Sequence, residues 1–118
     1  MTERPWLNSY PNEIQWDAEI PIDRLDALLD DAVARYGDNR FIDFLGRTFT
    51  FREIDAQVSH AAAGFQAIGV AQGVKVGLFL PNCPQFIVAF YGVLKAGGTV
   101  VNYSPLYAEE EILHQIED

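Results

Sequence analysis

The sequence is poor in cysteine and in positive charge, and it has no long apolar run. Cys83 is the single cysteine, so neither an intramolecular disulfide nor a zinc ligand set of cysteines can form, which favours a reducing compartment. Eight Lys and Arg stand against 17 Asp and Glu, and the net charge of −9 argues against nucleic acid and against an electrostatic hold on an anionic membrane. No segment has the length of a signal-peptide core or a transmembrane helix, so a cytoplasmic protein without a transmembrane segment is expected.

Groups that bind phosphate or perform catalysis are also scarce. Neither GxGxxG nor GxxxxGK[ST] occurs, and the turn Leu80–Pro84 has two prolines and no glycine, so few backbone N–H groups can approach a phosphate there. His60 has no second His or Cys at a useful spacing and is expected to be a surface or packing residue. Cys83 is a nucleophile only if the fold brings a base to it, and a small apolar role is the simpler interpretation. No catalytic residue and no metal ligand is predicted.

The chain does contain one stretch, residues 74–103, with the pattern of a βαβ unit. Its two ends are short and rich in β-branched and aromatic residues, which predicts strands. Residues 85–96 between them are apolar nearly all round, which predicts a helix covered on more than one side and ended by Gly97 and Gly98. Strands joined through a helix in this way lie parallel with a right-handed crossover. The expected fold class is therefore α/β.

Two amphipathic helices and a β-hairpin are expected before this unit. Residues 22–36 carry apolar side chains at helical spacing, and the carboxylates between them predict a solvated face: Asp23, Asp26, Asp30 and Asp31. A turn at Leu45-Gly46-Arg47 separates the strand-like segments 41–44 and 48–51. Thr50 and Glu53 form a capping box for the second helix, which Gly69 ends.

The two ends of the chain are expected to differ from this body. Residues 1–20 predict an extended arm, and residues 21–118 an incomplete N-terminal α/β subdomain. Trp6, Tyr10 and Trp16 give the arm a large apolar area, which should dock on the body or on another subunit. The acidic run 109–111 begins a last helix, and the sequence stops at residue 118 without a helix-ending signal.

Several segments resemble the ATP-dependent acyl-CoA synthetases of the adenylate-forming superfamily. Phe49–Ile54 is similar to that family's [LF]-[TS]-[YF]-x-E-[LI] stretch, and Leu94–Pro105 is similar to its LKAG…P motif. Further likenesses to bacterial long-chain fatty acid–CoA ligases lie at Trp6–Pro11, at Pro81–Phe86, and at Ser104–Tyr107 with the acidic helix after it. The resemblance covers essentially the whole chain. It departs at Tyr103-Ser104, where that branch usually has Val-Asn.

The resemblance implies the N-terminal part of a synthetase that turns a fatty acid, ATP and CoA into acyl-CoA, AMP and pyrophosphate through an acyl-adenylate. The family's phosphate loop, its Thr-Glu pair for magnesium, its ribose-binding aspartate and its C-terminal-domain lysine are motifs that this sequence lacks. The chain alone is therefore expected to be an inactive scaffold without a cofactor of its own. ATP, Mg and CoA, and the rest of the synthetase chain as partner, are implied for the full-length parent, with peripheral association at the inner membrane.

The resemblance also implies two candidate contact sites. The residues expected near the CoA entrance are Asn102, Tyr103, Ser104 and Pro105, and those expected to contact the second subunit of a homodimer are Trp6, Tyr10 and Trp16.

Other functions stay open at this point. The substrate can instead be a medium-chain, aryl or carnitine-type acid, or the chain can be a stand-alone binding module without catalysis. Helix 85–96 discriminates between a fragment and a complete module, because a fragment leaves its apolar surface exposed.

Overall fold

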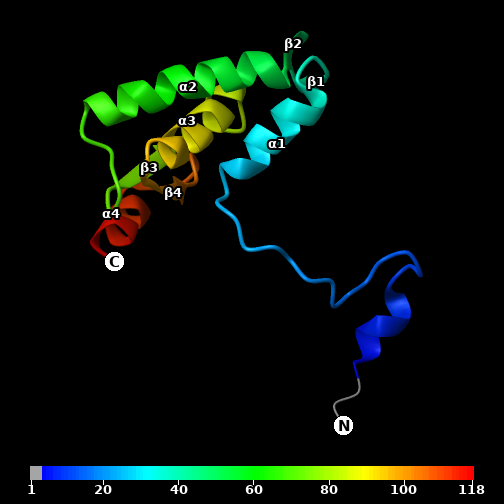
Figure 1. Cartoon of the computed structure of the whole chain (residues 1–118). Coiled ribbons are helices and arrows are strands. Elements are labelled where there is room, and N and C mark those ends of the chain that lie inside the picture. The colour runs from blue at the N-terminus through cyan, green and yellow to red at the C-terminus, as the bar shows by residue number, and fades with distance from the viewer. Residues whose placement is uncertain (1–3) are drawn as a thin grey trace.

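The computed structural model describes residues 4–118, which form an elongated arm and a layered body (Figure 1). The elements in chain order are the 3-10 helix η1 (Pro5–Ser9), α1 (Ala27–Tyr36), β1 (Arg40–Phe44), β2 (Arg47–Thr50), α2 (Phe51–Ala67), β3 (Lys75–Phe79), α3 (Pro84–Lys95), β4 (Thr99–Tyr103) and α4 (Glu109–Glu117). Within the described residues, no helix is long and apolar enough to cross a membrane.

The predicted βαβ unit is present and forms the centre of the body. β3 and β4 pair in parallel, from Lys75 opposite Thr99 to Phe79 opposite Tyr103, and α3 joins them. Pro84 occupies the first turn of α3, where its missing N–H has no helical partner to lose. The core between α2, α3 and the sheet contains fully buried Val93, with these neighbours: Ala62, Val70, Ala96, Val76 and Val100.

The hairpin and α2 follow from local sequence signals. Leu45 and Gly46 both have positive φ, 50° and 78°, as in the two-residue turn that matches the twist of antiparallel strands. The turn is thus one residue shorter than predicted, because Arg47 already pairs with Phe44. The capping box is confirmed: the Glu53 N–H donates to Thr50 Oγ1 at 3.1 Å, and the Thr50 N–H donates to Glu53 Oε2 at 2.8 Å.

The prediction for the first helix is wrong at its start. α1 begins at Ala27, not at residue 22, and Ile22 and Leu25 are exposed. Leu29 is the one residue of α1 that is fully buried, against Ile54 and Val58 of α2. A short helix in water is held mainly by packing of its apolar face, and Ile22, the first apolar residue of the predicted helix, is fully exposed.

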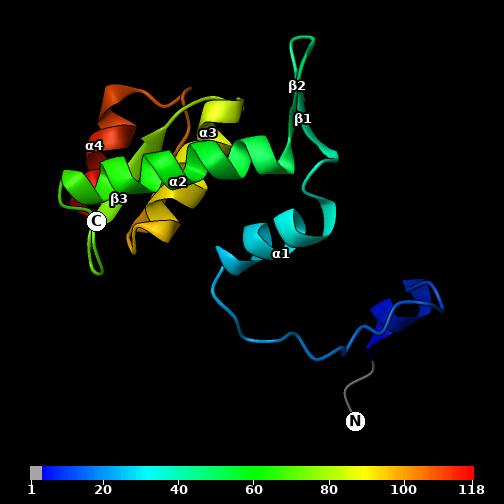
Figure 2. The ribbon, with the colours of Figure 1, turned by 45° about the horizontal axis from the view of Figure 1, so that its top comes forward.

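The arm stands away from the body in both ribbon views (Figures 1 and 2). Trp6, Tyr10 and Trp16 each remain 38–50% exposed, so the structure does not show the docking on the body that was one of the two expectations. The Arg4 guanidinium lies 4.1 Å from the centre of the Trp16 ring, a contact within the arm itself. Residues 1–3 lie outside the described residues.

α4 lies on the face of the sheet opposite α3 (Figure 1). Ile112 and Ile116 of α4 line a pocket of about 310 Å³ with Gly77, Phe79 and Tyr103, whereas Val76 and Val100 face the core below α3. The described part of the body is therefore layered as α2, α3, sheet and α4. The acidic first turn of α4, Glu109–Glu111, is as predicted.

Candidate functional site

The loop after β4 is held by contacts within the chain. Gln115 Nε2 donates to the Asn102 backbone oxygen at 3.1 Å, and the Leu106 N–H donates to Ser104 Oγ at 3.3 Å. Asn102 and Pro105 are exposed, and Tyr103 and Ser104 are half-buried. Asn102 and Tyr103 form the end of β4, and Ser104 and Pro105 follow directly after it. Their role toward CoA stays a prediction.

Tyr103 rests on a glycine of the neighbouring strand. A Cβ on Gly77 would lie 2.7 Å from Tyr103 Cε2, a distance that real Cβ atoms essentially never show. Tyr103 is one of the two positions at which the sequence departs from the long-chain ligase pattern. Its ring fits on the sheet because Gly77 has no side chain. The Tyr103 ring lines the pocket below α4.

Cys83 lies at the start of α3, with non-helical φ and ψ, and is half-buried. It lines an apolar pocket of about 310 Å³ between β1 and α3, together with Ile42, Phe44, Asn82, Pro84, Phe86 and Ile87. No histidine is among these residues. His60 is exposed on α2, as predicted.

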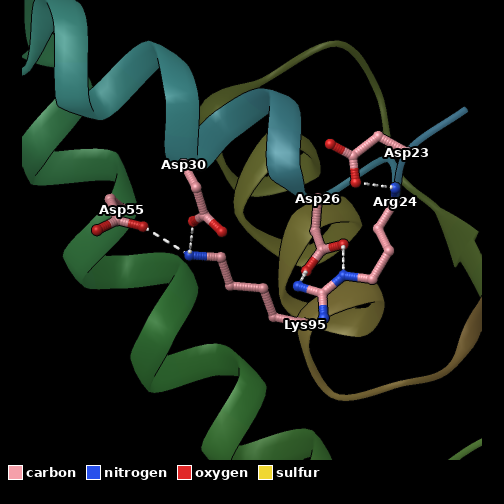
Figure 3. A network of polar contacts seen from close by, with 6 residues as sticks. All are labelled: Asp23, Arg24, Asp26, Asp30, Asp55 and Lys95. Atoms are coloured by element: carbon pink, nitrogen blue, oxygen red, sulfur yellow. Dashed lines mark hydrogen bonds and ion pairs between the residues drawn. The ribbon is translucent and has the colours of Figure 1, made fainter. Parts of the chain in front are cut away.

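The best-defined polar cluster of the body surrounds Lys95 (Figure 3). Its ammonium Nζ lies 2.7 Å from Asp30 Oδ1 of α1 and 2.8 Å from Asp55 Oδ1 of α2, and its side chain is only 19% exposed. One cation at the end of α3 thus connects α1, α2 and α3. Next to it, the carboxylate of buried Asp26 accepts two hydrogen bonds from the Arg24 guanidinium, at 2.9 and 3.2 Å.

The two carboxylates control the protonation of Lys95. Burial disfavours the ammonium, but hydrogen bonds and charge from Asp30 and Asp55 outweigh it and raise the pKa of Lys95 above its ordinary value of 10.5. Lys95 is therefore a fixed positive charge at neutral pH, which suits a cross-link between helices and not a nucleophile.

This cluster was not predicted, and it corrects the interpretation of the first helix. Asp26 and Asp30 were both assigned to a solvated face, but Asp26 is buried and Asp30 pairs with Lys95. The available signal was Lys95 itself, the single charge in the otherwise apolar α3. A buried cation requires a carboxylate partner, but the sequence does not say which aspartates supply it.

The described residues do not suit magnesium or a nucleotide phosphate. Among residues 4–118 there is no group of three or more His, Cys, Asp or Glu placed to hold a metal ion. The turn between β3 and α3 contains Pro81 and Pro84, which have no N–H to donate to a phosphate. No reaction step through these groups is assigned to this chain.

A parallel pair of strands joined through α3, with α4 on the opposite face, defines an α/β fold. The chain belongs to the AMP-binding enzyme family, whose profile matches residues 29–118.

Curated relatives refine this placement. The chain is 41% identical over 117 residues to a long-chain-fatty-acid–CoA ligase of Bacillus subtilis, and the match covers 99% of this chain and 21% of the ligase. A ligase of the same name from Escherichia coli O6:H1 is 39% identical over 121 residues, with 98% of this chain and 21% of that protein covered. The chain spans about a fifth of the length of the curated relatives it matches.

Solved structures confirm the fold. The N-terminal subdomain of Klebsiella oxytoca NpsA superposes with a TM-score of 0.78 at 22% identity, over 81% of this chain and 25% of that one. The anthranilate CoA ligase AuaEII, in complex with anthranoyl-AMP, gives a TM-score of 0.75 at 19% identity, over 82% and 19% of the two chains. The predicted fold, the N-terminal part of an adenylate-forming enzyme, is therefore correct.

Proposed function

We propose that this chain is the scaffold segment of an ATP-dependent long-chain fatty acyl-CoA synthetase. The parent enzyme converts fatty acid, ATP and CoA to acyl-CoA, AMP and pyrophosphate through an acyl-adenylate. The observation that carries the proposal is the 41% identity to the Bacillus subtilis ligase across 99% of the chain. ATP, Mg and CoA belong to the parent, whose location we propose to be cytoplasmic with peripheral attachment to the inner membrane.

The contribution of this segment to that reaction is structural. Lys95 forms ion pairs that join α1, α2 and α3, and the turn between β3 and α3 lacks two of the N–H donors that a phosphate site needs. The loop Asn102–Pro105 is the part of the segment proposed to lie near the CoA entrance. The Asn102 oxygen accepts a hydrogen bond from Gln115 Nε2, and Ser104 Oγ accepts one from the Leu106 N–H.

An aryl substrate is the second candidate. The anthranilate CoA ligase AuaEII shares the fold of this chain, but at 19% identity that likeness carries no information on substrate. The substrate of the long-chain relatives is preferred because their identity is about twice as high and extends through the arm.

The test is a chimera in which this chain replaces the matched segment of the Bacillus subtilis ligase. We expect the chimera to release pyrophosphate on addition of palmitate, ATP and CoA, because the catalytic groups of the ligase are intact and the segment is compatible with them. The isolated 118-residue chain should show no turnover in the same assay.

The matched control is the chimera with Cys83→Ser, which should retain full activity because Cys83 is assigned no catalytic role. Loss of activity in this variant, turnover by the isolated chain, or a folded chimera without activity contradicts the proposal.

A further inference from the structure

We infer that the tip of the β1–β2 hairpin, with Leu45 as its apolar anchor, is a contact through which the longer enzyme touches a lipid bilayer. The inference rests on the proposed function in one respect, because it names the part of the segment that makes the proposed peripheral attachment. Its test measures vesicle binding and not ligation, so the inference can fail while the ligase assignment holds.

Leu45 is an unusual residue for its position in the turn. It is the one non-glycine residue among residues 4–118 with a positive φ, 50°, and it is 91% exposed. A two-residue turn with positive φ at both positions favours Asn, Asp or Gly, because the Cβ of other residues is strained in this region. Leucine therefore stabilises the fold neither through its backbone conformation nor through burial. A strained and exposed apolar residue of this kind indicates a contact outside the fold.

Charged residues follow the tip at fixed depths along the hairpin. Phe44 pairs with Arg47 directly behind the turn, and Asp43 pairs with Thr48 one step further back. Successive residues of a strand lie about 3.4 Å apart, so Asp43 stands about 7 Å behind Leu45. Interfacial segments bury their apolar side by about 5–10 Å at the boundary of headgroups and acyl chains. Leu45 thus reaches this boundary while Arg47 stands at the depth of the phosphates and the carboxylate stays near the outer limit.

The Arg47 guanidinium is placed to bind a phosphate. Its Cζ lies 4.8 Å from the centre of the Phe49 ring, and no ion pair of Arg47 is found in the described part of the chain. A guanidinium over an aromatic face keeps the N–H donors at its edge available to an anion. Arg24 and Arg52, by contrast, each pair with an aspartate.

The contact has to be local, because the net charge of −9 disfavours a general attraction to an anionic surface. The hairpin meets this requirement, since it projects from the body at the start of α2 (Figure 2). Phe44 continues the apolar surface from the tip into the pocket of about 310 Å³ that Phe86 and Ile87 also line. The apolar surface at this end of the hairpin is therefore larger than one side chain.

A protein partner fits the tip less well than a bilayer does. A specific protein interface buries about 800 Å² on each side and has aromatic or arginine anchors in matching pockets. The turn is only two residues wide, Leu45 and Gly46, and no side chain extends beyond them. A bilayer has no fixed shape to match, so the insertion of one apolar turn is enough to contribute to binding.

The experiment uses the chimeric ligase described above and vesicles of equal parts phosphatidylethanolamine and phosphatidylglycerol. Co-sedimentation measures the bound fraction against lipid concentration. We expect Leu45→Asn to weaken binding at least tenfold, because burial of a leucine side chain is worth about that factor or more. Arg47→Gln should weaken it about fivefold through loss of a charge at the surface. Leu45→Met keeps an unbranched apolar side chain and should bind like the wild-type chimera.

The substitution Leu45→Asn also separates membrane binding from folding. Asn adopts a positive φ more readily than leucine, so this variant should unfold at the same temperature as the wild-type chimera or at a higher one. Ile68→Asn is the matched control, since Ile68 is 79% exposed at the opposite end of α2 and should leave vesicle binding unchanged. Equal losses in the two Asn variants, or no vesicle binding by the wild-type chimera, overturn the inference.

An environment-sensitive fluorophore tests whether the tip is free before it meets a bilayer. The dye is attached to Leu45→Cys in a chimera whose other cysteines are replaced by serine. We expect emission typical of water without vesicles and a blue shift with them, and no shift from the same dye at Ile68→Cys. Blue-shifted emission without vesicles would show that the rest of the enzyme or a second copy covers the tip, and this result overturns the inference, as does a Leu45→Cys dye that does not respond to vesicles. None of these measurements depends on the activity of the chimera.

Discussion

At the scale of single residues, Lys95 is the side chain whose ion pairs join α1, α2 and α3. We expect Lys95→Met to lower the free energy of unfolding by about 1–3 kcal/mol, because two partly buried carboxylates lose a charged hydrogen-bond donor. The lower part of this range is favoured, since Asp30 is half-exposed and solvent screens it. Urea unfolding of the chain measures the effect.

Lys75→Met is the matched control, since Lys75 is exposed and no ion pair of it is found among the described residues. Its effect should stay within about 0.5 kcal/mol. Equal effects of the two substitutions would show that the cluster contributes no stability.

The pH dependence of the Lys95 contribution has a definite sign. The folded-state pKa of Lys95 is raised above 10.5, so its contribution is complete below the pKa of the unfolded chain and is lost as pH rises through the folded-state pKa. The difference in stability between wild type and Lys95→Met should therefore be constant near neutral pH and shrink only above pH 10.5. A difference that already shrinks between pH 7 and 9 contradicts the assignment.

The residue scale is also where prediction from sequence failed. Asp26 and Asp30 have the spacing of a solvated face, and helical periodicity places them correctly relative to one another. The pairing of Asp30 depends on where Lys95 lies after α3 has packed on α2, and this information is tertiary. Asp26 pairs with Arg24, only two residues away, but its burial likewise depends on tertiary packing. Local pattern can identify Lys95 as a cation that needs a partner, but not the partner.

At the scale of elements, the contribution of helix capping to stability can be tested by removing one N-terminal cap and adding another. Thr50→Ala removes the cap of α2 and should cost about 1 kcal/mol of stability. α4 has half of the same motif: the Ala108 N–H donates to Glu111 Oε2 at 2.7 Å, but Ala108 has no side-chain oxygen to return the bond. Ala108→Ser should therefore stabilise α4 by up to about 1 kcal/mol.

Thermal unfolding followed by far-UV circular dichroism measures both changes, with Thr50→Ser as the variant that keeps the cap and should stay close to wild type. Two substitutions that change stability in the same direction would contradict the assignment of these caps.

Elements with strong local signals were predicted well. The capping box of α2 and the proline start of α3 depend on residues close in sequence and are confirmed. The hairpin is also confirmed, although Arg47 belongs to β2 and not to the turn. The start of α1 was wrong because Ile22 fits the helical period but is fully exposed, and Leu25 is only half-covered. Periodicity states which side chains share a face, but not whether another element covers that face.

At the scale of the whole molecule, the body does not cover its own apolar surface. The residues from Phe86 to Tyr91 of α3 are all only half-buried, and the two-stranded sheet leaves the β3 edge open. The arm adds three half-exposed aromatic residues, Trp6, Tyr10 and Trp16. These features agree with a segment of a larger enzyme more readily than with a complete binding module, because isolated domains rarely leave such surface in water.

We therefore expect the isolated chain to self-associate, and we propose that the arm is one of the contacts, as in a homodimer of the parent. Sedimentation velocity across a hundredfold concentration range should show mass increasing with concentration.

The triple variant Trp6→Ser, Tyr10→Ser and Trp16→Ser should shift this increase to at least tenfold higher concentration, because its apolar arm contacts are gone. The matched variant Asn8→Ser, Asn12→Ser and Glu13→Ser alters exposed polar residues of the same arm and should behave like wild type. A wild-type chain that remains a monodisperse monomer and unfolds cooperatively would reject self-association, and association that persists unchanged in the triple variant would exclude the arm and leave the half-buried surface of α3 as the contact.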